Sequence, residues 1–256
     1  MFSRMNRIYI GTSGWVYKGW ADDFYRGLRQ REHFHHYTTQ FPTVEINATF
    51  YRLPSLKAVH DWATQAPEGF QFAVKGSRFI THMKRLNNLQ NSLNRFIRRI
   101  KPLQPRIGPL LWQLPPNLKK DLPRLENFLR RLPDYFSHAV EFRDASWLTP
   151  DTFELLRNHN AAFVSVSSLR MPFDLTVTAD FVYVRFHGLA GGAYHDYTRD
   201  ELAPWAAHLL GNAQAGRNCY AYFNNDLNVR APHNAKLLME LCGDLAVPPL
   251  AGQADG

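Results

Sequence analysis

Short apolar or alternating runs recur along the chain, and segments with helical periodicity separate most of them. Eight of these runs predict β-strands, at residues 8–13, 43–47, 70–75, 109–114, 138–143, 162–168, 181–188 and 219–225. Seven segments predict helices, at residues 31–41, 54–66, 87–101, 119–131, 149–159, 198–211 and 233–242. The connection from Leu169 to Asp180 is short and contains proline, so we expect no full helix there.

The alternation of strands and helices over 256 residues predicts the α/β class. We expect a single-domain TIM-type (β/α)8 barrel with a short or irregular sixth crossover. A doubly wound open sheet is the main alternative, and it is disfavoured because no G-x-G-x-x-G motif follows the first strand. The barrel should span residues 8–243, between a disordered N-terminus at 1–7 and a flexible tail at 244–256.

Alternate residues of a barrel strand face the surrounding helices, and the others face the barrel axis. Because the helix-facing set must be apolar, the pattern predicts which side chains point inward. In the sixth strand, for example, it assigns Val164 and Val166 to the helices. The predicted inward set is polar and comprises Glu45, Asn47, Lys75, Gln113, Glu141, Arg143, Ser165, Ser167, Tyr183, Arg185, His187, Tyr222 and Asn224.

Most of these polar residues fall toward the C-terminal ends of strands, where barrel enzymes build their active sites. An unpaired buried charge costs several kcal/mol, so the charged members must pair with one another, with water or with a ligand. One interpretation is a structural salt-bridge network that closes the barrel. The other is a ligand site, which we favour because cations outnumber carboxylates and suit an anionic ligand.

The composition adds a basic balance to this picture. The formal net charge is +8, and the segment Gly69 to Lys120 holds eleven Lys or Arg residues and no Asp or Glu. This segment predicts either a solvated basic face or a contact surface for a polyanion. We find no signal peptide or membrane span, so we expect a cytoplasmic protein with no membrane partner, and a monomer is compatible with the sequence. Cys219 and Cys242 should be reduced core residues.

Cations and glycines at strand ends are typical of phosphate sites in barrels. Gly188, Gly191 and Gly192 follow the seventh strand, and their backbone N–H groups could approach an anion. A flexible glycine loop is the alternative. The side chains expected to add positive charge are Lys75, Arg78, Arg143 and Arg185.

Aromatic residues crowd the first loop, in the stretch IGTSGWVYKGW. They predict a stacking surface for a base or a sugar ring at the rim of the site, worth roughly 1–3 kcal/mol per stacked base. The alternative is that Trp15 and Trp20 pack in the core. The aromatic residues of the expected surface are Trp15, Tyr17, Trp20, Phe50, Tyr51 and Trp147.

Several catalytic roles remain open for the inward residues. His187 is the acid–base candidate because its ordinary pKa is near neutrality, and Glu141 or Glu45 would be the base. The sequence predicts no cofactor, although Glu45, Glu141 and His187 could together hold a divalent metal. Two less favoured alternatives are a glycoside hydrolase that uses Glu45 and Glu141 and a Schiff-base enzyme that uses Lys75.

Seven blocks of the sequence, in order, resemble the domain of unknown function 72 family, also called YecE-like, over about residues 8–240. The blocks are IGTSGWVYKGW, FPTVEINATFYRLPS, FQFAVKGSRFITHMKRL, PLLWQLPPNL, VEFRDASW, VYVRFHG and CYAYFNND. The resemblance implies a (β/α)8 barrel but no established reaction. The segment LNVRAPHNA departs from the small, Gly-containing turn that the family leads us to expect. The matching positions are Glu45, Asn47, Lys75, Arg78, Gln113, Glu141, Arg143, Trp147, Arg185, His187 and Asn224.

The leading hypothesis is a barrel enzyme, a hydrolase or lyase, whose mouth binds a phosphate-bearing substrate. A nucleotide or a nucleic acid is the first class to test, and an anionic small molecule is the other. The rival hypothesis is a non-catalytic nucleic-acid-binding module that uses the basic face of helix 87–101, with Arg95, Arg98 and Arg99.

Overall fold

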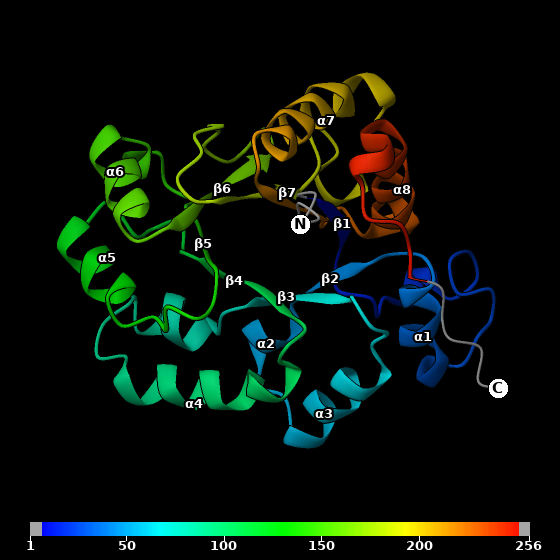
Figure 1. Cartoon of the computed structure of the whole chain (residues 1–256), viewed down its shortest axis with the longest axis horizontal. Helices are drawn as coiled ribbons and strands as arrows, with labels where there is room; N and C mark the ends of the chain where they lie inside the picture. Colours follow the sequence, from blue (N-terminus) through cyan, green and yellow to red (C-terminus); the bar gives the residue numbers. More distant parts are fainter. Residues whose placement is uncertain (1–6, 251–256) are drawn as a thin grey trace, which may run out of the picture.

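The computed structural model describes residues 7–250, which form a closed barrel of eight parallel strands (Figure 1). Every strand pairs with its neighbours along the chain, and β8 pairs with β1 to close the sheet, with Ile8 opposite Cys219 and Thr12 opposite Phe223. All eight predicted strands are confirmed, with ends that differ by no more than two residues. The strands are β1 (Ile8–Ser13), β2 (Thr43–Ile46), β3 (Gln71–Lys75), β4 (Ile107–Gln113), β5 (His138–Glu141), β6 (Ala161–Ser167), β7 (Phe181–Phe186) and β8 (Asn218–Phe223).

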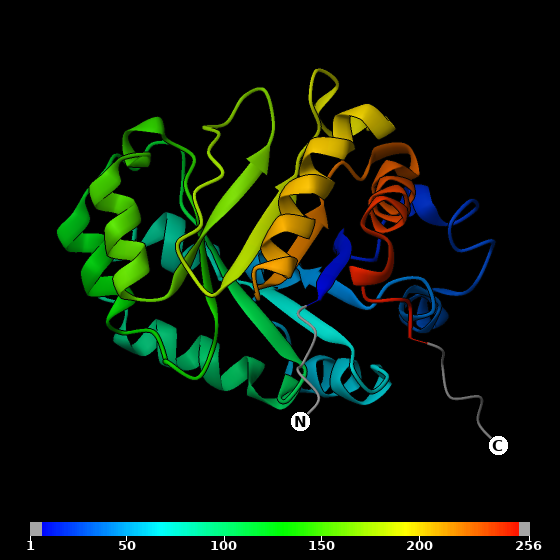
Figure 2. The ribbon, with the colours of Figure 1, turned by 45° about the horizontal axis from the view of Figure 1, so that its top comes forward.

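Helices surround the barrel in the order of the chain, as Figures 1 and 2 show. All predicted helices are present, and most are a few residues shorter than expected. A short helix after β2, which the sequence pattern did not predict, adds one more, whereas the connection between β6 and β7 has no helix, as expected. The helices are α1 (His33–Thr38), α2 (Ala48–Tyr51), α3 (Leu56–Gln65), α4 (Gln90–Ile100), α5 (Leu122–Leu129), α6 (Pro150–Asn158), α7 (Arg199–Gln214) and α8 (Arg230–Cys242).

Local sequence explains where several helices begin. Thr198 and Glu201 form a capping box at α7: the Thr198 hydroxyl accepts a hydrogen bond from the Glu201 N–H, and the Glu201 carboxylate accepts one from the Thr198 N–H. Ser55 caps α3 by accepting a hydrogen bond from the N–H of Ala58. Pro150 is the first residue of α6, where its missing N–H costs no hydrogen bond.

The core has two layers. The larger layer lies between strands and helices and includes Val44, Phe72 and Val184, together with the buried, unpaired Cys219 and Cys242 that the sequence predicted. The smaller layer fills the barrel interior and consists of Ala73, Leu111, Ala139, Ala162, Val164, Val166, Phe181, Tyr183, Tyr220 and Tyr222. The apolar interior supports the polar residues that sit above it at the C-terminal strand ends.

The predicted orientation of β6 is wrong. Val164 and Val166 belong to the interior layer, where they pair in register with Tyr183 and Arg185. Ser167 accordingly does not face the axis, and its hydroxyl accepts a hydrogen bond of 2.8 Å from the Tyr197 hydroxyl. All residues of β6 are buried, so both faces tolerate an apolar residue, and a serine can face the helices once its hydroxyl is satisfied.

The chain continues to pack on the barrel beyond the predicted end at residue 243. Ala246 forms an isolated parallel bridge with Ile8, and the N–H of Val247 donates to the Ile8 carbonyl at 2.9 Å. Both residues are buried. The predicted disordered N-terminus (1–7) and the outer part of the predicted flexible tail (244–256) fall largely on residues 1–6 and 251–256, outside the described residues.

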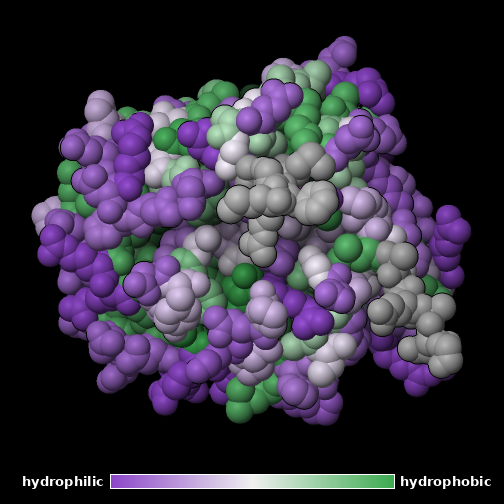
Figure 3. All heavy atoms as spheres, in the orientation of Figure 1, coloured by the Kyte–Doolittle hydropathy of each residue, from purple (hydrophilic) through white to green (hydrophobic). Residues whose placement is uncertain are grey.

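Hydrophilic residues cover most of the face shown in Figure 3, and hydrophobic residues appear mainly in the recesses between them. Within residues 7–250, no helix combines the length and the apolar character needed to span a bilayer.

Candidate ligand site at the barrel mouth

A cavity of about 440 Å³ opens at the C-terminal ends of the strands. Its volume falls within the usual range for small-molecule sites. The structure brings together most of the predicted site residues there, because parallel strands all end on the same side of a barrel. This cavity, called the mouth cavity below, is lined by Asn47, Phe50, Tyr51, Lys75, Arg78, His82, Gln113, Arg143, Arg185, His187 and Asn224.

Arg185 forms the floor of the mouth cavity between two carboxylates. Its Nη1 donates to Oε2 of Glu141 at 2.6 Å, and its Nη2 donates to Oε1 of Glu45 at 2.8 Å. All three residues are 0 % exposed. A charge this deeply buried must be paired, and one cation between two anions satisfies that requirement. The interpretation as a structural salt-bridge network therefore describes this layer well.

Other donors occupy the remaining oxygens of the two carboxylates. Glu45 accepts hydrogen bonds from the Ser13 hydroxyl at 2.6 Å and the Tyr183 hydroxyl at 2.7 Å. Glu141 accepts a further hydrogen bond from Nε of Arg143. Every oxygen of both carboxylates thus has a protein donor.

These donors hold both carboxylates in the ionised form. Burial alone would raise the pKa of Glu141, but the guanidinium groups of Arg143 and Arg185 bring it well below its ordinary value. Burial likewise would raise the pKa of Glu45, and Arg185 and then Lys75 lower it. The structure therefore gives no support to the predicted catalytic role of Glu45 and Glu141. A carboxylate of low pKa with a donor on each oxygen is a weak base and a poor acid for a glycoside hydrolase.

The geometry also gives no support to a divalent metal on Glu45, Glu141 and His187. Nε2 of His187 lies 3.8 Å from Oε2 of Glu141, and that oxygen already accepts a hydrogen bond from Arg185. In the described part of the chain, no group of three or more His, Cys, Asp or Glu side chains is placed to hold a metal ion.

His187 lies against the cationic floor of the cavity. Its Nε2 is 3.2 Å from Nη1 of Arg185, and its Nδ1 is 3.3 Å from the amide nitrogen of Asn224. Burial, with Arg185, lowers the pKa of His187 to about 4. The imidazole is therefore neutral at neutral pH, which gives no support to the acid–base role that the ordinary pKa of histidine predicted for His187.

Lys75 and Arg78 contribute positive charge that no carboxylate balances. Within residues 7–250, neither side chain forms an ion pair. Lys75 instead lies over the ring of Phe50, whose centroid is 4.3 Å from Nζ. Burial, and then Arg185, lowers the pKa of Lys75 to about 7, although Glu45 and Glu141 act in the opposite direction. Arg78 is exposed at the rim of the mouth cavity.

Sequence reasoning missed His82, which reaches the mouth cavity from a single π-helical turn, Phe79–Met83. π-Helical turns often occur at functional sites. His82 lies in the basic segment from Gly69 to Lys120, which holds no Asp or Glu. That composition predicted a positively charged surface, but no periodicity in the sequence predicted the π-helical turn.

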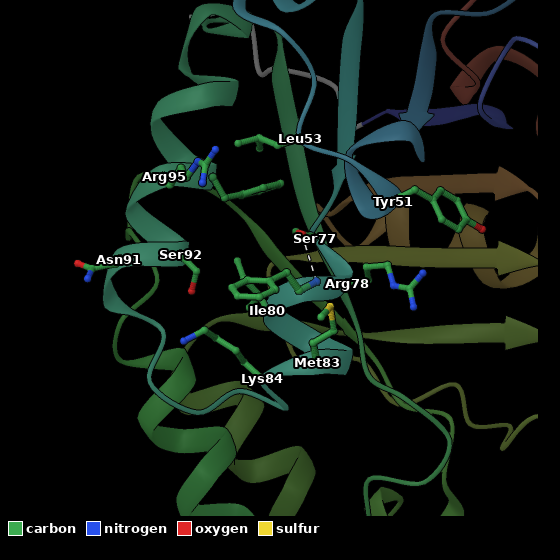
Figure 4. A pocket seen from close by; sticks show the side chains of 12 residues that line it. Tyr51, Leu53, Ser77, Arg78, Ile80, Met83, Lys84, Asn91, Ser92 and Arg95 are labelled. Atoms are coloured by element: carbon green, nitrogen blue, oxygen red, sulfur yellow. Dashed lines mark hydrogen bonds between the residues drawn. The ribbon is translucent and has the colours of Figure 1, made fainter.

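A second cavity, of about 630 Å³, adjoins the mouth cavity and shares Tyr51 and Arg78 with it. In Figure 4 these two side chains point toward the strands, whereas Arg95 and Lys84 line the side nearer α4. Tyr51, 71 % exposed, stands at the boundary between the two cavities. We call this second cavity the side pocket.

The predicted aromatic stacking surface is wrong for the tryptophans. Trp15 is 8 % exposed and packs in the core against Phe34 and Trp62, with ring centroids 5.1 and 5.6 Å away. Trp20 and Trp147 are fully buried, so they cannot stack on a ligand at the rim. Large apolar surface drives these rings inward, and their N–H groups find backbone partners there, the Asp226 and Leu118 carbonyls.

The structure gives the predicted phosphate loop after β7 no support at Gly188 and Gly192, two of its three glycines. The N–H of Gly188 donates to the Tyr197 hydroxyl, and that of Gly192 donates to the Leu189 carbonyl, so neither is free for an anion. Gly188 is required for packing instead, because a Cβ on it would lie 1.8 Å from the Gly192 carbonyl oxygen.

Comparison with known proteins places the chain in a family. The family model described as "Protein of unknown function DUF72" matches residues 9–254. UPF0759 protein YunF of Bacillus subtilis is 26 % identical over 91 % of this chain and 94 % of its own length. UPF0759 protein YecE of Escherichia coli is 35 % identical over 38 % of this chain and 34 % of its own length.

Solved structures of DUF72 family proteins superpose on this chain. A DUF72 family protein from Thermotoga maritima superposes with a TM-score of 0.84 and 28 % identity, over 92 % of this chain and 98 % of that one. A DUF72 family protein from Enterococcus faecalis, 20 % identical, superposes with a TM-score of 0.82 over 97 % of this chain and 100 % of that one, which shows the shared fold. The chain therefore belongs to the DUF72 family and has its (β/α)8 barrel fold.

Proposed function

We propose that the protein is an enzyme whose mouth cavity binds a phosphate-bearing substrate. The observation that carries the proposal is the charge imbalance around the cavity. Glu45 and Glu141 are neutralised by Arg185 and Arg143, whereas Lys75 and Arg78 form no ion pair among the described residues. A phosphate dianion would balance the charge of Arg78 and that of the protonated fraction of Lys75.

Arg143 and Arg78 are the side chains best placed to hold that phosphate. Arg143 is fixed by its hydrogen bonds to Glu141 and to Oε1 of Gln113, and its side chain is still 18 % exposed. In the described part of the chain its Nη1 has no hydrogen-bond partner, so it keeps a donor for a ligand oxygen. A guanidinium that is already held in position loses little entropy on binding.

Nucleotides and single-stranded nucleic acids are the first ligands to test beside inorganic phosphate. Tyr51 offers an exposed ring at the boundary of the mouth cavity and the side pocket, where a base could stack while its phosphate reaches Arg78. At such a site Lys75 would transfer the proton, rather than Glu45 or Glu141, whose oxygens already accept hydrogen bonds from the protein.

The rival binding module on α4 has less support. Arg95 lines the side pocket, Nη1 of Arg99 donates to the Pro54 carbonyl, and Nε of Arg98 donates to the Asn94 carbonyl. The three arginines therefore do not form one free basic face.

Calorimetric titration with inorganic phosphate, a nucleoside monophosphate and a short single-stranded oligonucleotide tests the proposal. We expect Arg143→Ala and Arg78→Ala each to weaken binding about tenfold, which corresponds to about 1.4 kcal/mol. Arg98→Ala, on the exposed side of α4, is the matched control and should bind like the wild type. Affinity equal to that of the wild type in both mouth variants, or no binding of any probe, would overturn the proposal.

A further inference from the structure

Lys75 is a buried amine that the salt-bridge network leaves out. It is the last residue of β3, it is 7 % exposed, and it lines the mouth cavity. The ring of Phe50 covers Nζ on one side, 4.3 Å from the ring centroid. Within residues 7–250, no carboxylate oxygen lies within ion-pair distance of this nitrogen, although buried lysines are normally paired.

The two nearby carboxylates do not bind Lys75 because other donors already hold them. Arg185 spans both of them, Arg143 binds Glu141, and Ser13 and Tyr183 bind Glu45. The Lys75 amine thus reaches a ligand cavity with no counterion of its own.

The charged groups that act on Lys75 favour the neutral amine overall. Burial and the positive charges of Arg185 and Arg143 lower its pKa, and the negative charges of Glu45 and Glu141 raise it, with a result of about 7. A large fraction of the amine is therefore unprotonated at neutral pH. A buried, neutral lysine next to other cations is an activated nucleophile toward carbonyl compounds.

We propose that Lys75 forms an imine with the carbonyl carbon of a small phosphorylated aldehyde or ketone bound in the mouth cavity. The inference rests on the proposed function, because Arg78 and Arg143 would hold the phosphate while the carbonyl meets Nζ. It narrows the substrate to the small-molecule class, which suits a cavity of about 440 Å³.

The covalent step balances without any other reactant. The nitrogen lone pair forms a bond to the carbonyl carbon, the C=O π pair moves to oxygen, and one N–H proton transfers to that oxygen to give a carbinolamine. The C–O bond then breaks, the second N–H proton leaves with the hydroxyl group as one water, and a C=N bond remains. No oxidant or reductant takes part.

Three related probes test the inference on the full chain. Pyridoxal 5′-phosphate carries an aldehyde and a phosphate, pyridoxal carries the aldehyde alone, and pyridoxine 5′-phosphate carries the phosphate without a carbonyl. Aldehyde adducts are reduced with borohydride and located by peptide mass spectrometry, and binding of pyridoxine 5′-phosphate is measured by calorimetry. Lys75→Met keeps the length of the side chain, and Lys84→Met is the matched control, because Lys84 also lies over an aromatic ring, that of Phe79.

We expect pyridoxal 5′-phosphate to label Lys75 about tenfold faster than any other lysine near neutral pH. The adduct should vanish in Lys75→Met and persist in Lys84→Met. Labelling spread over surface lysines and unchanged in Lys75→Met would overturn the imine.

The other probes separate the two proposals. If pyridoxine 5′-phosphate binds the wild type and Arg143→Ala weakens it, while Lys75 takes no label, the phosphate site stands and the imine fails. If pyridoxal labels Lys75 as fast as its phosphate ester does, the imine stands and the phosphate site fails.

Discussion

Glu45 and Glu141 show how neighbouring donors decide what a carboxylate can do. Both were predicted as catalytic because they point inward at strand ends. In the structure their oxygens accept hydrogen bonds from Arg185, Arg143, Tyr183 and Ser13, and their pKa values are lowered. They fix the arginines in position, and the positive charge left for a ligand comes from residues outside this network.

The lowered pKa of Lys75 predicts that the free energy of unfolding depends on pH. The folded protein holds this amine with a pKa of about 7, below its ordinary value, so the unfolded chain binds more protons between those two values. Relative to Lys75→Met, the wild type should therefore lose stability as the pH falls, by about 2 kcal/mol between about pH 9 and about pH 7. Urea unfolding of both proteins at a series of pH values measures the difference.

The comparison with Lys75→Met cancels the groups that titrate equally in both proteins. Lys57→Met is the control, because Lys57 is exposed and pairs with Asp61. A difference between Lys75→Met and wild type that does not change with pH would contradict a depressed pKa for Lys75.

At the scale of elements, the loop after β1 supports the barrel rather than the ligand. Trp15 packs on Phe34 and Trp62 between the barrel and its helices. We expect Trp15→Ala to lower the free energy of unfolding by about 3–5 kcal/mol, as deletion of a buried aromatic side chain does. Chemical denaturation monitored by circular dichroism measures this change.

Tyr51→Ala is the matched control for Trp15→Ala, because Tyr51 is 71 % exposed and its loss should change stability by less than about 0.5 kcal/mol. If Trp15→Ala hardly changed the free energy of unfolding but greatly reduced ligand affinity, the sequence-based prediction that Trp15 stacks on a ligand at the rim would be correct.

The strands differ in how far their sequences predict orientation. In β7, Val182, Val184 and Phe186 alternate with Tyr183 and Arg185, so the inward residues were identified correctly. In β6 the alternation of valine and serine predicted the reverse of the observed orientation. Both faces of β6 are buried, and each accepts either a valine or a serine whose hydroxyl is hydrogen-bonded. The polarity of these residues therefore does not predict which of them point to the barrel axis.

At the scale of the whole molecule, the C-terminal segment completes the packing around β1. A chain that ends at Gly243 loses the Val247–Ile8 hydrogen bond and the buried side chains of Ala246 and Val247. We expect its melting temperature to fall by about 4–8 °C, which corresponds to a loss of about 2 kcal/mol in a protein of this size. Scanning calorimetry measures the shift.

A chain that ends at Leu250 is the control, because it keeps every contact that the structure describes. It should melt like the full-length protein. Equal melting temperatures for the two shortened chains would show that the barrel ends at residue 243, as the sequence suggested.

The sequence by itself determined the barrel, because strand and helix periodicities are local and eight alternations leave few other topologies. It also determined most residues of the mouth cavity, since parallel strands bring their C-terminal ends together. Only the tertiary structure decided which charges are already paired, which aromatic rings are buried and which backbone N–H groups are used. Those properties depend on partners far apart in the chain, such as Arg185 with Glu45, and no local pattern records them.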